Sequence, residues 1–239
     1  MEIICYLSNG YPTLEESYRI AEAYAQAGCK IIEIDFPARD PYLENELIKS
    51  RMHEALKVCD DYDQYMESIL KLKKNLPEVQ LLLLAYEETV IEIGIDKFTR
   101  FCIENELRDI ILVGLKGDKV KNEMIAKGIR VSCYVQYHLD ETEVALAKES
   151  NGFVYMQAKP DGNIHPNYPT LKECIQFVRE QGVERPIYCG VGVHTPADAK
   201  EVKEAGADAA FIGSTILKLY DDIPTMKKTI HEFIEQCRA

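Results

Sequence analysis

The chain has 239 residues, of which 46% are hydrophobic, enough for a sizeable core and more consistent with one domain than with two. Its 40 acidic side chains outnumber 28 basic ones and give a net charge of −12. This charge argues against duplex nucleic acid or an anionic membrane surface as a partner, so any anionic ligand must be held by local groups. The amino terminus lacks a basic signal region, and no apolar run approaches about 18 residues, so we expect a cytoplasmic protein.

The eight cysteines are scattered along the chain, with no CxxC pair and no clustered histidines. Small buried thiols in a reducing compartment explain this distribution better than disulfides do. The spacing of cysteines and histidines also offers no set of metal ligands, so we expect no metal site.

Apolar strand-like runs alternate with helical patterns along the whole chain, as is typical of parallel βαβ units. The expected strands are 3–7, 30–36, 79–85, 109–113, 130–135, 152–156, 186–189 and 209–212. The expected helices are 14–27, 62–76, 95–105, 118–127, 141–149, 171–181, 196–205 and 223–236, with an additional one at 46–59. Eight such units over residues 1–239 predict a single (β/α)8 TIM barrel domain. A doubly wound sheet is the alternative, because periodicity does not show whether a sheet closes.

The second expected strand carries two carboxylates on one face. Side chains alternate along a strand, so Ile32, Ile34 and Phe36 share one side while Glu33 and Asp35 share the other. The larger apolar set should lie under the helices, which places both carboxylates inside the barrel near its carboxyl-end mouth, where active sites of this fold are built. Such a pair suits general acid/base chemistry, because two close buried carboxyls raise one pKa. A structural ion pair is the other interpretation.

Further polar residues follow later strands, and each has an ordinary structural interpretation. Glu87 and Glu88 after the third strand either add acid to the mouth or belong to a solvated loop. Tyr155 on the sixth strand either faces the mouth or belongs to the barrel core. His138 and His194 lie in βα loops, where a lone histidine is more often solvated than catalytic.

Glycines follow the last two expected strands, in the segments Cys189-Gly190-Val191-Gly192 and Ile212-Gly213-Ser214-Thr215. They allow backbone amides to approach a ligand, and the helices that follow add a favourable dipole for an anion. Either segment alone also fits a tight turn. Together, on consecutive βα loops, they predict a phosphate site made by Gly190, Val191, Gly192, Gly213 and Ser214.

The chain resembles the α subunit of tryptophan synthase over nearly its whole length. The motifs that carry the resemblance are GYPT at 10–13, IEIDFPARDP at 32–41, GIDKF at 94–98, GFVY at 152–155, GVG at 190–192 and GS at 213–214. The resemblance implies a retro-aldol cleavage of indole-3-glycerol phosphate to indole and glyceraldehyde 3-phosphate, without a cofactor. It also implies contact with a β subunit, although only one of the two loops used for that contact is recognisable.

By the same resemblance, Glu33 falls on the catalytic glutamate that moves protons to and from the indole carbon and the glycerol hydroxyl. Glu44 falls on the aspartate that polarises the indole N–H, and Tyr155 on the tyrosine beside the catalytic glutamate. Tyr6, Asp35 and Tyr86 are further candidates for the pocket.

The chain departs from the family pattern mainly at the indole end. Asp35 replaces a glycine and is expected to intrude on the ring pocket or to perturb the pKa of Glu33. Glu44-Asn45 stands where the family has Asp-Gly, and the loops that follow the third, fourth and sixth strands differ, at 86–88, 115–117 and 161–164. The helix that usually precedes the first strand is missing. These departures leave two alternatives open, a related aldolase or isomerase with a more polar substrate and a non-catalytic partner protein.

Overall fold

The computed structural model describes residues 1–114 and 116–238, so Leu115 of the altered fourth loop lies outside the described residues. The strands are β1 (Glu2–Leu7), β2 (Ile31–Asp35), β3 (Gln80–Tyr86), β4 (Asp109–Val113), β5 (Arg130–Val131), β6 (Cys133–Val135), β7 (Val154–Gln157), β8 (Ile187–Gly190) and β9 (Ala209–Ile212). They form one parallel sheet in the order β5-β4-β3-β2-β1-β9-β8-β7-β6.

The two ends of this sheet belong to one interrupted strand, the predicted strand 130–135. At Ser132 the chain changes neighbours: the Ser132 amide donates to the Ile110 carbonyl of β4, whereas the Cys133 amide donates to the Phe153 carbonyl next to β7. β5 therefore pairs with β4 and β6 with β7, which nearly closes the sheet into a barrel. The (β/α)8 prediction is confirmed, and the doubly wound alternative is wrong.

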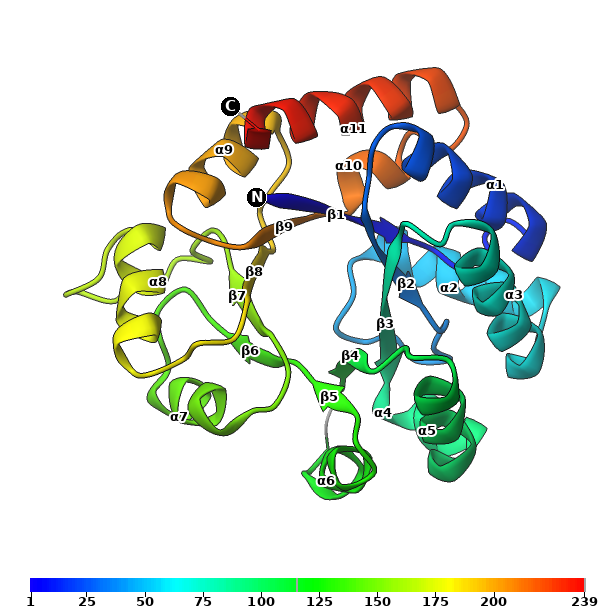
Figure 1. Ribbon diagram of the computed structural model, residues 1–239, viewed down its shortest axis with the longest axis horizontal. Helices are drawn as coiled ribbons and strands as arrows, with labels where there is room; N and C mark the ends of the chain where they lie inside the picture. The colour runs from blue at the N-terminus through cyan, green and yellow to red at the C-terminus, as the bar shows by residue number, and fades with distance from the viewer. Residues whose placement is uncertain (115, 239) are drawn as a thin grey trace.

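The helices surround the strands as an outer ring (Figure 1). This ring comprises α1 (Leu14–Gln26), α3 (Tyr62–Asn75), α5 (Ile95–Glu104), α6 (Lys119–Ala126), α7 (Glu141–Glu149), α8 (Leu171–Glu180), α9 (Pro196–Glu204) and α11 (Ile223–Arg238). The additional predicted helix is α2 (Glu46–Val58). Among the described residues, no helix is both long and apolar enough to span a membrane.

Two short helices were not predicted, α4 (Glu87–Ile93) after β3 and α10 (Ser214–Leu217) after β9. Both begin directly at a strand end, where a short segment offers too few turns for helical periodicity to show. Helix α4 corrects the expectation of a solvated loop at Glu87, whose side chain is buried and accepts a hydrogen bond from the Lys116 amide at 2.7 Å.

The alternation of β2 is as predicted. Ile32, Ile34 and Phe36 are fully buried under the helices, and the Phe36 ring packs edge-on against Phe98 and Phe101 of α5. Because strand side chains alternate, Glu33 and Asp35 point to the barrel interior. This arrangement fixes the position of the carboxylates relative to the mouth.

Candidate active site

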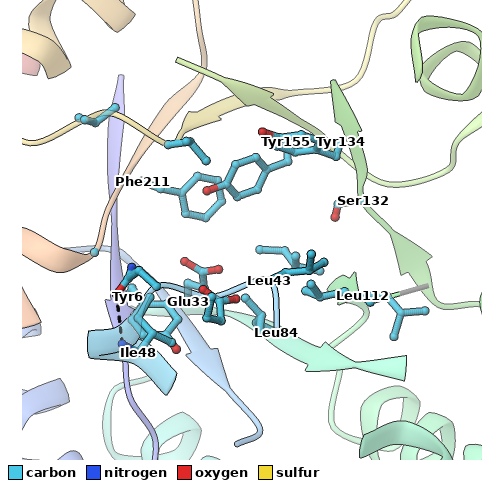
Figure 2. Close-up of a pocket in the computed structure, with 18 of the residues that line it drawn as sticks. Tyr6, Glu33, Leu43, Ile48, Leu84, Leu112, Ser132, Tyr134, Tyr155 and Phe211 are labelled. Carbon is cyan, nitrogen blue, oxygen red and sulfur yellow. Dashed lines mark hydrogen bonds between the residues drawn. The ribbon is translucent and has the colours of Figure 1, made fainter. Parts of the chain in front are cut away.

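A cavity of about 820 Å³ opens at the carboxyl ends of the strands, and Figure 2 shows the side chains around it. Its wall is mainly apolar, with Leu84 from β3, Leu112 from β4 and Phe211 from β9. Its polar groups come from two parts of the barrel, carboxylates from β2 and the loop after it, and glycine loops after β8 and β9. An apolar chamber with a few convergent polar groups is the usual form of a small-molecule site.

Glu33 points into this cavity from the middle of β2 (Figure 2). Its side chain is only 5% exposed, and its carboxyl group accepts no hydrogen bond from any residue that the structure describes. Burial raises the pKa of Glu33 well above its usual value, and the nearby Glu44 and Asp35 raise it further. A buried carboxyl group with a raised pKa is suited to giving a proton to a bound molecule.

Glu44 lines the same cavity from the loop between β2 and α2, and burial raises the pKa of its carboxyl group, while Lys49 opposes that rise. Two contacts fix the loop around it. Asn45 caps α2 by accepting hydrogen bonds from the Leu47 and Ile48 amides, and the Tyr86 hydroxyl accepts one from the Leu43 amide at 3.2 Å. The site thus contains a second acid that the fold holds in place, next to Glu33.

Tyr155 of β7 stacks on Phe211 with 4.5 Å between ring centroids and an angle of 15° between ring planes. The ring of Tyr134, on the neighbouring strand β6, lies 5.7 Å from the Tyr155 ring between centroids. The pKa of Tyr155 is raised well above its usual value, first by burial and then by the charge of Glu33. Tyr155 therefore serves the cavity as a neutral aromatic wall beside Glu33.

The glycine loops present free backbone amides to the cavity. Val191 and Gly192 both have left-handed backbone angles, with φ of 60° and 103°, and such strain in a β-branched residue is typical of ligand loops. Within the described chain, the amides of Gly192 and Val193 donate no hydrogen bond, and the first turn of α10 leaves the Ser214 amide free. The Thr215 hydroxyl donates to the His194 carbonyl at 3.1 Å and joins the two loops.

The predicted site residues fall into two groups. Those that line the cavity are Glu33, Glu44, Tyr155, Val191, Gly192, Gly213, Ser214, Tyr6 and also His194. Those that lie outside its wall are Asp35, Tyr86, Gly190, Glu87, Glu88 and His138.

The residues outside the wall support it or belong to other contacts. Asp35 sits behind Tyr6, whose hydroxyl donates to it at 2.5 Å, so it does not intrude on the ring space as expected. Its charge does raise the pKa of Glu33, as the alternative expectation stated. Gly190 lies under the Tyr155 ring, and Glu88 forms an ion pair with Lys116.

Several cavity residues were not predicted, among them Leu43, Ile48, Leu84, Leu112, Ser132, Tyr134 and Phe211. Strand alternation offered a signal for some of them. Phe211 lies two residues before Gly213 on one strand face, and Tyr134 lies two residues after Ser132 on another. Leu43 and Ile48 come from a loop and a helix that fold over the mouth, and local periodicity carries no signal for such positions.

Comparison with known sequences points to the same family in each case. The model of the family described as tryptophan synthase alpha chain matches residues 1–239. The tryptophan synthase alpha chain of Methanosarcina barkeri is 26% identical over 243 residues, covering 99% of this chain and 90% of that protein. That of a Cyanothece species is 26% identical over 229 residues, covering 90% of this chain and 82% of that protein.

Solved structures share the fold. A structure from Aquifex aeolicus superimposes with a TM-score of 0.86 at 24% identity, covering 98% of this chain and 92% of the other. The aminoacrylate-bound tryptophan synthase of M. tuberculosis gives a TM-score of 0.82 at 21% identity, covering 99% and 93%. Since the family model matches the sequence from end to end, this chain belongs to the tryptophan synthase alpha chain family.

Proposed function

We propose that the chain is a lyase that cleaves indole-3-glycerol phosphate by a retro-aldol reaction into indole and glyceraldehyde 3-phosphate. One observation carries the proposal: the buried carboxyl group of Glu33, without a hydrogen-bond partner in the described chain, lines the same apolar cavity as free backbone amides. The apolar wall suits a bicyclic ring, and the amides of Gly192, Val193 and Ser214 suit a phosphate dianion.

In this reaction Glu33 acts as an acid and then as a base. Its proton goes to the ring carbon that bears the side chain, and the resulting carboxylate takes the proton of the adjacent glycerol hydroxyl. The carbon–carbon bond between ring and side chain then breaks, leaving indole and the aldehyde, and Glu33 is protonated again. Glu44 accepts a hydrogen bond from the ring N–H, where positive charge develops. No cofactor enters these steps.

Release of indole from indole-3-glycerol phosphate by the wild type and by Glu33→Gln tests the proposal. We expect the variant to lose at least about 100-fold in kcat, the usual contribution of a general acid/base. Glu87→Gln is the matched control, because Glu87 is equally buried at 5% exposure but lies outside the cavity wall. Turnover that survives Glu33→Gln would remove Glu33 from the mechanism.

The alternative of a more polar substrate rested on carboxylates crowding the mouth. Asp35, Glu87 and Glu88 all lie outside the cavity wall, which supports the indole substrate over a more polar one. The non-catalytic alternative is decided by the same indole assay, because any turnover that depends on Glu33 excludes it.

We further propose that a tryptophan synthase beta-like subunit binds over the mouth. Leu43, Tyr134, Leu146 and Val191 line the cavity and are also at least 40% exposed, which makes an apolar rim around the opening. Exposed apolar groups clustered in this way are typical of protein interfaces. Sedimentation of the chain with a purified beta subunit tests this, and Leu43→Asp with Val191→Asp should weaken the complex.

A further inference from the structure

Asp35 is a buried acid immediately behind the cavity wall. It is 1% exposed and lies two residues beyond Glu33 on the same face of β2. The Tyr6 hydroxyl donates to its Oδ2 at 2.5 Å, and the Asn9 amide donates to its Oδ1 at 2.7 Å. Tyr6 also lines the cavity, and its hydroxyl is engaged by Asp35, which lies outside the cavity wall.

The donors around the two acids decide which one gives up its proton first. Asp35 accepts two hydrogen bonds, whereas Glu33 accepts none from the described residues, and hydrogen bonds to the charged form favour ionisation. Burial raises the pKa of Asp35 to about 7, while Tyr6, Asn9 and Arg51 oppose the rise. The donors therefore favour the ionised form of Asp35, whereas no donor in the described chain favours that of Glu33.

The other groups around Asp35 do not reverse this order. The titratable and charged groups that act on it or feel it are Tyr6 of β1, Glu33 of β2, Glu44 of the following loop, Arg51 of α2, Tyr65 of α3 and Tyr220 after α10. The tyrosines are neutral near pH 7, since burial raises the pKa of Tyr6 well above its usual value and that of Tyr220 to about 12. Arg51 provides the positive charge and favours the Asp35 carboxylate.

We propose, building on the proposed function, that Asp35 is a positioning residue for the reaction of Glu33. Ionised and bound to Tyr6 and Asn9, it fixes the Tyr6 ring against the ligand and keeps Glu33 in its acid form when substrate arrives. After Glu33 has given its proton to the ring carbon, two neighbouring carboxylates repel each other. Recovery of the proton from the glycerol hydroxyl relieves that repulsion.

Asp35→Asn keeps the shape of the side chain and removes its charge. In this variant we expect Glu33 to ionise about one pH unit lower, because a nearby like charge is gone. The basic limb of the kcat profile for indole release should move down by the same amount, with about a tenfold loss at pH values above it and little change in KM. Infrared titration of the Glu33 carboxyl band, identified by its absence in Glu33→Gln, measures the same shift without any substrate.

Tyr6→Phe provides a second variant that alters Asp35 without replacing it. Loss of one donor makes Asp35 harder to ionise, so the Glu33 band should move in the same direction and by a smaller amount. A Glu33 band that titrates at the wild-type pH in both variants, with unchanged circular dichroism, overturns the proposal. If the wild type releases no indole, the proposed function fails, and the infrared titration still decides the role of Asp35.

Discussion

Gly190 ends β8 directly under the ring of Tyr155, and its replacement by alanine tests the architecture of the site. A Cβ atom at position 190 would lie 2.1 Å from Oη and 2.6 Å from Cζ of Tyr155, whereas non-bonded carbon contacts favour about 3.5–4.0 Å. The ring must therefore move by more than about 1 Å. Phe211 stacks on it at 4.5 Å, so it cannot move without disturbing the cavity wall.

From this overlap we expect Gly190→Ala to lower the free energy of unfolding by about 1–3 kcal/mol, the usual effect of overpacking. Indole release should fall on the order of 100-fold, because a 1 Å displacement in a site has about that effect. Urea unfolding followed by circular dichroism and initial rates measures both. Gly117→Ala is the control, since a Cβ there meets nothing within 4 Å.

A double-mutant cycle isolates the contact between Gly190 and Tyr155. In a Tyr155→Ala background the overlapping atoms are gone, so Gly190→Ala should change the free energy of unfolding by less than about 0.5 kcal/mol. Equal destabilisation in both backgrounds would show that the glycine is needed for another reason, and the reasoning would be refuted.

Three further predictions concern the acids, the amides and the helix cap. The pKa of Asp35 is raised to about 7 and that of Glu33 well above its usual value, so the folded state keeps protons that the unfolded state releases, and stability falls as the pH rises from about 4 through the folded-state pKa values. Urea midpoints should show a shallower fall for Glu33→Gln. Inorganic phosphate should raise the melting temperature of the wild type by binding the free amides. Ser214→Asp places a negative charge beside these amides and should abolish that rise, whereas Ser214→Ala should keep it. Asn45→Ala removes the cap of α2 and should destabilise the protein by about 1 kcal/mol, with Asn45→Asp close to wild type in the same urea assay.

The sequence was sufficient for the features that depend on local pattern. The alternation of apolar runs with helical repeats predicted each barrel strand to within a few residues, because strand and helix periods are set by backbone geometry. The same alternation placed Glu33 and Asp35 on the inner face of β2, opposite Ile34 and Phe36. Glycines after two consecutive strands were likewise visible as a motif.

Only the tertiary structure decided which of these residues meet. The Tyr6 hydroxyl donates to Asp35, which lies 29 residues away in the sequence. No local pattern indicates this contact or the position of Asp35 outside the cavity wall. Gly190 looked like a ligand-binding glycine, but its lack of a side chain serves the Tyr155 ring of the neighbouring strand. At Ser132 the hydrogen bonding of the predicted strand passes from the Ile110 carbonyl of β4 to the Phe153 carbonyl next to β7, and no local pattern indicates this change of neighbour. Closure and side-chain packing depend on contacts between distant segments, and these are fixed when the whole chain folds.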